Sequence, residues 1–380
     1  AQKLLNASNP RLETGMFRTP EGIEAAVQLA ELIGASTSTT STAGPMGFPQ
    51  RHPLCGPGAE SNYDYVLGLE ANSPDLSLRR PIVNSITSQR DVMGIGFGSL
   101  REDYVPTPPG SEPTPLAQSQ RQPQGTVLEI DAQTSIPVII AELSRLITPG
   151  KQREIAQRKT RHTRANRENF LATLRAAVEE KKKGWDLSPV STARIYAELW
   201  PLIMDEDWCL ASPSNFSGAH HRELWEHNKP YSFLGTQGAA GMGYGPGASA
   251  GAALAARSRG RFVVNVQPDG DLNYAPGALW TAVHHELPML TVMHNNRAWH
   301  QEYMFIQYLA GVRGRGTDRG HIGCVLRDPF IDYSKMAQAY GMDSEGPIED
   351  PALLAAALGR GVESVKTGKP YLIDVVTQPR

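Results

Sequence analysis

Several features that would narrow the class of this 380-residue protein are scarce or missing. Cysteine is scarce: Cys55, Cys209 and Cys324 are far apart and match no metal-ligand spacing, so we expect reduced thiols in a cytoplasmic protein and no disulfide framework. The chain has no large excess of either charge, because it contains 37 basic and 39 acidic residues. Neither nucleic acid nor an anionic membrane is therefore an expected partner. No run of 18 apolar residues occurs, so no membrane span is predicted.

The residues that are present fit two α/β domains. A length of 380 residues and a hydrophobic share of 40% allow each domain its own core. Residues 1–150 are predicted to form a small α/β domain, with a helix over 19–35 and short strands at 63–71 and 125–132. Pro, Gln and Ser crowd residues 105–125, which predicts an extended surface loop.

The second half of the chain changes character twice. Residues 151–184 are highly charged and helix-prone, which predicts a solvated linking helix; binding of an anionic ligand is the alternative, which the interleaved Glu residues weaken. Residues 185–380 then alternate helix and strand patterns. Strands are predicted there at 208–212, 261–266, 288–296 and 371–378. We therefore expect an α/β protein with two doubly wound parallel sheets, joined by a charged helix.

Polar side chains follow two of these predicted strands. Pro268-Asp269-Gly270-Asp271 comes directly after one buried-type strand, and Asn295-Asn296 ends the next. Because the carboxyl ends of neighbouring parallel strands face one crevice, a single βαβ crossover places Asp269 beside Asn296. The alternative is that both pairs are only loop-forming residues. Either pair alone would favour that alternative, but both together favour a ligand site.

The chemistry of this pair points to a metal and a diphosphate. A carboxylate beside an amide carbonyl is a hard oxygen pair, and Mg²⁺ takes few protein oxygens and completes its shell with water and phosphate. Gly270 allows close backbone approach, and the helix expected after Asn273 offers N–H groups to an anion. His284 and His285 fall on that crossover helix, where we expect them to point away from the crevice.

This stretch resembles the thiamine-diphosphate signature, and it looks most like acetohydroxyacid synthase and benzoylformate decarboxylase; NYAPGALWTAVHHELP is particularly similar to the latter. The resemblance implies that Asp269, the Asn296 side chain and the Ala298 carbonyl oxygen bind Mg²⁺. Two positions depart from the pattern. The signature begins with Gly-Asp-Gly, and Pro268 stands in place of its first Gly. Asp271 stands where similar proteins have a small or hydroxyl residue that contacts the diphosphate. A carboxylate there repels phosphate unless it turns away or lies by the metal.

A second motif, GAAGMGYGPGASAGAALA at 238–255, is a run of small residues. Tight packing of a helix on a sheet is one interpretation of such a run. The resemblance implies another: Met242, after Gly241, separates the two rings of the cofactor and bends it. The Met242 N–H and the Ala240 carbonyl would then hold the pyrimidine ring. In that geometry the cofactor deprotonates itself and acts as nucleophile and electron sink.

Other candidates lie on either side of these motifs. The resemblance implies that Asn215 and Ser217 contact the diphosphate. A loop whose polar groups form hydrogen bonds with one another is equally consistent with SPSNFSG. Trp299 and His300 follow the Asn-Asn pair and are candidate substrate or gate residues. Trp299 is also a candidate cofactor contact, and His300 and Met242 are the candidate catalytic residues. The Arg- and Gly-rich segment 311–320 is either a mobile lid or a plain surface loop.

Residues 1–150 resemble the central domain of the same superfamily. No Gly-rich phosphate turn supports FAD there, so we expect none. The chain begins as if in mid-protein, and the domain that carries the catalytic Glu of the superfamily is expected on another polypeptide or outside this sequence. The resemblance therefore implies a thiamine-diphosphate- and Mg²⁺-dependent lyase or carboligase for a 2-oxo acid, assembled as a homo-oligomer. A split or non-catalytic subunit and a nucleotide-binding α/β protein are the alternatives.

Overall fold

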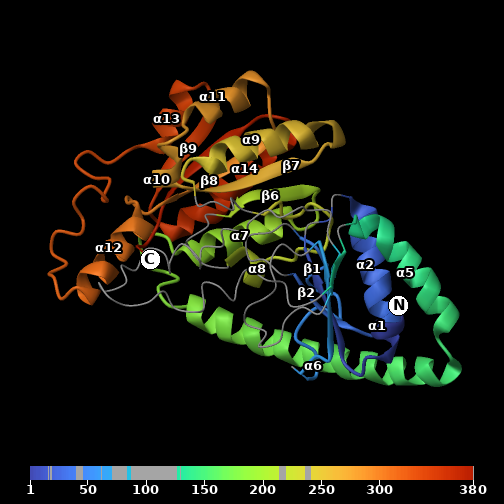
Figure 1. Ribbon diagram of the computed structural model, residues 1–380. Helices are drawn as coiled ribbons and strands as arrows, with labels where there is room; N and C mark the ends of the chain where they lie inside the picture. Colours follow the sequence, from blue (N-terminus) through green and yellow to red (C-terminus); the bar gives the residue numbers. More distant parts are fainter. Residues whose placement is uncertain are drawn as a thin grey trace. The chain divides into compact units, whose positions relative to one another are not determined.

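The computed structural model describes residues 1–15, 17, 19–39, 46–60, 62–70, 84–86, 126–128, 130–213, 220–235 and 241–379. The chain forms two compact units, and Figure 1 shows the elements of each. Their ranges are Ala1–Arg175 with His227–Ala240, and Ala176–Glu226 with Gly241–Arg380. The predicted domain limits at 150 and 185 stay a prediction, and the predicted loop at 105–125 lies outside the described residues.

The first unit is built on a parallel sheet of five strands in the order β2-β1-β3-β4-β5. The strands are β1 (Pro10–Thr14), β2 (Ser36–Thr39), β3 (Tyr65–Leu69), β4 (Asn84–Ile86) and β5 (Thr126–Leu128). The helices of this unit are α1 (Gln2–Asn6), α2 (Pro20–Ile33) and α5 (Ala132–Leu146), together with most of α6 (Pro149–Lys181). The helix and strands predicted within 1–150 are therefore present.

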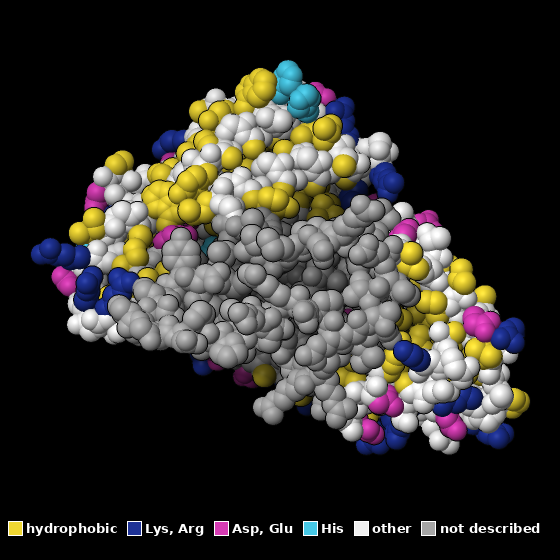
Figure 2. All heavy atoms as spheres, viewed as in Figure 1, with side chains coloured by type: hydrophobic (Ala, Val, Ile, Leu, Met, Phe, Trp, Pro, Cys, Tyr) yellow, Lys and Arg dark blue, Asp and Glu magenta, His cyan; other side chains and the backbone are white. Residues whose placement is uncertain are grey.

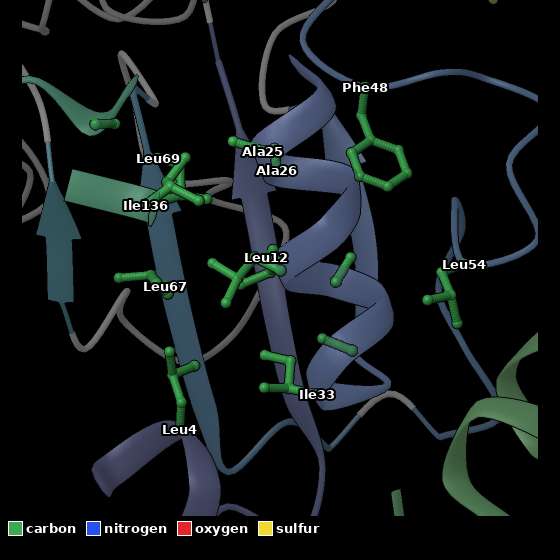
Figure 3. Close-up of a cluster of buried hydrophobic side chains, with 14 of the residues drawn as sticks. Leu4, Leu12, Ala25, Ala26, Ile33, Phe48, Leu54, Leu67, Leu69 and Ile136 are labelled. Atoms are coloured by element: carbon green, nitrogen blue, oxygen red, sulfur yellow. The ribbon is translucent and has the colours of Figure 1, made fainter. Parts of the chain in front are cut away.

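The core of the first unit lies between α2 and the central strands, as Figure 3 shows. Leu12 of β1 and Ile33 of α2 are fully buried, as is Leu69 of β3. Burial of a side chain of this size stabilises the fold by roughly 1.5–3 kcal/mol. Helix α2 ends at Ile33, two residues before the predicted limit, because Gly34 adopts the left-handed conformation at φ 61° that favours glycine.

Helix α6 is not solvated on all sides, so that expectation is wrong for one of its faces. Arg158, His162 and Asn166 lie on this face and are only 2–4% exposed. Arg158 Nη1 donates to the carbonyl oxygens of Ala7 and Ser8, at 3.2 and 3.1 Å. One face of a charged helix can thus be buried when its side chains donate hydrogen bonds to backbone carbonyl oxygens. These bonds replace the hydrogen bonds to water that both groups lose on burial.

The second unit contains a parallel sheet in the order β6-β7-β8-β10-β9. The strands are β6 (Trp208–Pro213), β7 (Phe262–Pro268), β8 (Met289–Asn295), β9 (Asp343–Ile348) and β10 (Tyr371–Val376). The helices are α7 (Thr192–Ile203), α8 (His220–Leu224), α9 (Tyr244–Ala256), α10 (Asp269–Leu272), α11 (Gly277–His284), α12 (His300–Val312), α13 (Tyr333–Ala339) and α14 (Leu354–Lys366). Two parallel-sheet α/β domains were predicted, and this is confirmed.

Local details of the second unit differ from expectation at helix starts. The cap of α7 is Ser191, whose hydroxyl accepts the Arg194 N–H at 3.3 Å; the sequence 187–203 also contains Ser188 before Pro189, which we expected to be the cap. The crossover between β7 and β8 is two helices, α10 and α11, rather than one continuous helix after Asn273. Within the described part of the chain, no helix is long and apolar enough to cross a membrane.

Candidate functional site

Strands β7 and β8 are adjacent and parallel, and they end side by side, with Pro268 in register with His294. The next residues converge as predicted. The Ala298 N–H donates both to Asp269 Oδ2, at 3.1 Å, and to Asn296 Oδ1, at 3.2 Å. The structure thus brings together all three residues that the sequence proposes as metal ligands.

The Asp269 carboxylate is held in a desolvated position. It is 1% exposed, and its Oδ1 accepts the Gly270 N–H at 2.8 Å. Burial raises the pKa of Asp269 to about 7, while the N–H groups of Gly270 and Ala298 act in the opposite direction. A cation at this point would offset the cost of burying the charge.

The turn after β8 has features that suit a metal and a diphosphate. Arg297 adopts φ 60°, a conformation that non-glycine residues rarely take and that occurs often at functional sites. Within the described residues, the carbonyl oxygen of Ala298 accepts no hydrogen bond and the buried Nε1 of Trp299 has no partner. The Trp299 ring packs on Gly270, where a Cβ would lie 2.5 Å from Trp299 Cδ1. A free acceptor and a free donor therefore lie beside Asp269.

A supporting network beneath Asp269 was not predicted from the sequence. The Tyr333 hydroxyl donates to the Asp269 carbonyl oxygen at 3.2 Å and accepts from Asn273 Nδ2 at 3.1 Å. The Tyr333 N–H donates to Asp374 Oδ2 at 3.1 Å, and Asp374 Oδ1 accepts from Asn295 Nδ2 at 2.9 Å. The one signal for this network is a charged residue in the apolar strand sequence YLIDVV. The Asn273 side chain belongs to this network, and its role as a cofactor ligand stays a prediction.

Asp271 turns its carboxylate toward the second motif. Its Oδ1 accepts the Gly243 N–H at 2.5 Å, and its Oδ2 accepts from Gln267 Nε2 at 2.8 Å. Met242, one residue earlier, has a side chain that is 45% exposed, and Gly241 is exposed as well. The structure therefore connects the Asp269 turn directly to the small-residue segment. Contact of either segment with a cofactor stays a prediction.

The remaining candidates are placed differently. Asn215, Ser217 and Ala240 lie outside the described residues. His300 is half-buried at the start of α12, with its ring centroid 6.1 Å from that of Tyr303. Residues 311–319 are exposed.

The two crossover histidines lie on the outer surface. His284 and His285 are exposed, and Figure 2 shows histidine side chains (cyan) at the top of the view, where Figure 1 places α11. Among the described residues, no group of three or more His, Cys, Asp or Glu could hold a metal ion.

The carboxylate of Glu13 in the first unit is not available as a free acid. Glu13 is fully buried in β1, where it pairs with Arg11 and accepts the Ser38 hydroxyl at 2.6 Å. This arrangement gives Glu13 a structural partner on each side.

The structure shows a parallel α/β domain in which the side-chain oxygens of Asp269 and Asn296 meet at the carboxyl edge of the sheet. Comparison with known proteins identifies the class more closely. Residues 216–375 match the thiamine pyrophosphate enzyme family, C-terminal TPP binding domain. The resemblance to thiamine-diphosphate-dependent enzymes that the two motifs predicted is therefore confirmed.

Individual relatives agree with this match. The chain is 29% identical over 195 residues to the acetolactate synthase large subunit IlvG of Mycobacterium tuberculosis, covering 51% of this chain and 32% of that protein. It is 29% identical over 145 residues to benzoylformate decarboxylase of Pseudomonas aeruginosa, covering 37% of this chain and 24% of the relative.

A solved structure shows the same fold over the whole chain. It is the thiamine diphosphate-dependent 4-hydroxybenzoylformate decarboxylase of Rhodococcus jostii RHA1, with a TM-score of 0.65, 18% identity, and coverage of 100% of this chain and 63% of the other. The chain therefore spans less than two thirds of the length of the relatives it matches.

Proposed function

We propose that this protein binds thiamine diphosphate through Mg²⁺ and serves as a lyase or carboligase for a 2-oxo acid or a related acyl donor, similar to acetolactate synthase. One observation carries the proposal. The Asp269 carboxylate and the Asn296 amide oxygen converge on one N–H at the carboxyl edge of the sheet, within the residues that match a TPP binding domain.

Each residue of the site has a definite role in this proposal. Asp269, Asn296 and the Ala298 carbonyl oxygen hold Mg²⁺, which prefers such hard oxygen ligands. The unpartnered Nε1 of Trp299 donates to the diphosphate. Met242 lies against the cofactor rings. Bound thiamine diphosphate supplies the nucleophile and the electron sink for cleaving a C–C bond beside a carbonyl.

Further roles concern the less central candidates. Asn215, Ser217, Gly241 and Ala240 complete the cofactor contacts, and His300 faces the substrate. The diphosphate lies beside the Gly270 backbone, and the missing side chain of Gly270 leaves room for the Trp299 ring.

A second polypeptide is part of the proposal. Within α12 no residue is buried, and Met304, Phe305, Ile306, Tyr308 and Val312 are 40–67% exposed. Figure 2 shows hydrophobic and basic side chains together at the left of the view, where Figure 1 places α12. Exposed apolar groups of this extent are typical of protein interfaces. We propose a second copy of the chain or a polypeptide carrying the catalytic Glu as the partner, in the cytoplasm, where the three free thiols would persist.

Thermal unfolding with and without ligand tests cofactor binding. Mg²⁺ with thiamine diphosphate at a hundredfold excess over Kd should raise Tm by about 5–10 °C, and Asp269→Ala should abolish the rise. Asp343→Ala is the matched control, because Asp343 is an exposed carboxylate at the start of β9. Stabilisation by ADP or NAD in place of thiamine diphosphate would favour a nucleotide-binding protein and refute the proposal.

Consumption of a 2-oxo acid tests the activity separately. The protein is incubated with Mg²⁺, thiamine diphosphate and a panel of 2-oxo acids, alone and with a polypeptide that supplies the catalytic Glu. Turnover in either mixture supports the lyase or carboligase. Cofactor binding without turnover in both would favour a non-catalytic subunit.

A further inference from the structure

Asp271 joins two segments that are far apart in the sequence. Its Oδ1 accepts the N–H of Gly243, 28 positions earlier, at 2.5 Å. Its Oδ2 accepts from Gln267 Nε2 at 2.8 Å, and Gln267 is fully buried in β7. Gln267 Nε2 also donates to the Pro268 carbonyl oxygen at 3.1 Å. Both carboxylate oxygens are therefore engaged by an amide donor, one from the backbone and one from a side chain.

The fit between the two segments requires glycine. Gly243 has φ 85°, and a Cβ there would lie 2.9 Å from Tyr274 Cβ. A Cβ on Gly245 would lie 2.6 Å from Gln267 Oε1 and 3.0 Å from Asp271 Oδ2. Contacts below 3.0 Å force a displacement of one partner. The start of α9 thus lies directly on the β7 terminus, and the carboxylate is the polar bond between them.

We propose that Asp271 is a positioning residue, which ties the backbone turn carrying Met242 to the turn carrying Asp269. The inference rests on the proposed function, in which Asp269 holds the metal at the diphosphate end and Met242 contacts the rings. A carboxylate facing the diphosphate would repel it. The Asp271 carboxylate instead accepts a short hydrogen bond from the Gly243 N–H. A hydrogen bond to a carboxylate is stronger than one between neutral groups. Asp271 therefore fixes the distance between the two ends of the site.

Hydrogen exchange of the cofactor-free protein tests the connection itself. Asp271→Ala removes both bonds, whereas Asp271→Asn keeps an oxygen that can accept the Gly243 N–H. Losing a hydrogen bond to a charged group should speed exchange of the Gly243 amide about tenfold in Asp271→Ala, with a smaller change in Asp271→Asn. Asp343→Ala is the control. Unchanged exchange in Asp271→Ala, or equal acceleration in both Asp271 variants, would overturn the proposal.

Ligand dissection by calorimetry tests the consequence for binding. Thiamine diphosphate and inorganic diphosphate are each titrated with Mg²⁺ into the wild type and Asp271→Ala. The preference for thiamine diphosphate over inorganic diphosphate should fall about tenfold in the variant, because only the larger ligand reaches Met242. A general loss of structure would weaken binding of both ligands equally. An unchanged ratio of the two affinities in Asp271→Ala would therefore contradict a positioning role. If the wild type binds neither ligand, the proposed function fails, while the exchange experiment still decides whether Asp271 fixes the Gly243 turn.

Discussion

Removing the hydroxyl of Tyr333 should loosen the turn at Asp269 without creating a cavity. The side chain is 1% exposed, and Tyr333→Phe keeps the ring and its packing. The change removes one of two donors from the buried Asp269 carbonyl oxygen, which keeps the Asn273 N–H at 3.4 Å, and it removes the acceptor of Asn273 Nδ2 at 3.1 Å. Loss of one hydrogen bond costs about 0.5–1.5 kcal/mol, and Asn273 is partly exposed, so water can replace its partner. We therefore expect a loss of about 1 kcal/mol.

Thermal and urea unfolding of the cofactor-free protein would measure this loss, which corresponds to a decrease in Tm of about 2–4 °C for a unit of this size. Tyr340→Phe is the matched control. Tyr340 follows the same helix α13, and its hydroxyl makes no hydrogen bond within the described residues. Binding of Mg²⁺ with thiamine diphosphate should weaken in Tyr333→Phe alone. Equal stability of the two variants would refute the assigned role of the Tyr333 hydroxyl.

Three further predictions concern other buried groups. Burial raises the pKa of Asp374 from its ordinary 3.8 to about 6; the folded state therefore binds more protons between these values, and Asp374 should lower stability by about 3 kcal/mol as pH rises from 4 to 6. In pH-dependent urea unfolding, Asp374→Asn should lose this contribution and keep the one from Asp269, whose pKa is raised to about 7. Burial lowers the pKa of His162 below 6.5, so the neutral ring, which accepts a backbone N–H, stabilises the fold above that pH; the stability should be lost on acidification, and the loss should be smaller in His162→Gln. Gly245→Ala should destabilise by about 1–3 kcal/mol, because its Cβ would meet the Gln267 side chain at 2.6 Å. Gly247→Ala, with open space around it, should stabilise α9 by about 0.5–1 kcal/mol, and equal effects of the two glycine changes in urea unfolding would contradict the steric argument.

The sequence by itself determined the α/β class and the pairing of Asp269 with Asn296. Both follow from short-range patterns. β-branched residues mark a buried strand, and one crossover must return the chain so that consecutive parallel strands end at the same edge. The positions of Asp269 and Asn296 could therefore be predicted without knowledge of contacts outside one βαβ unit.

Only the tertiary structure decided which groups support that turn. Tyr333 and Asp374 reach Asp269 and Asn295 from elements 64 and 79 positions away. The direction of the Asp271 carboxylate depends on a turn 28 residues earlier. The buried face of α6 could likewise not be predicted, because a charged sequence indicates an exposed helix. Its side chains are buried only because backbone carbonyl oxygens elsewhere in the fold accept their hydrogen bonds. Periodicity encodes the face that an element buries, whereas hydrogen bonds between distant residues depend on where the packed elements place their polar atoms.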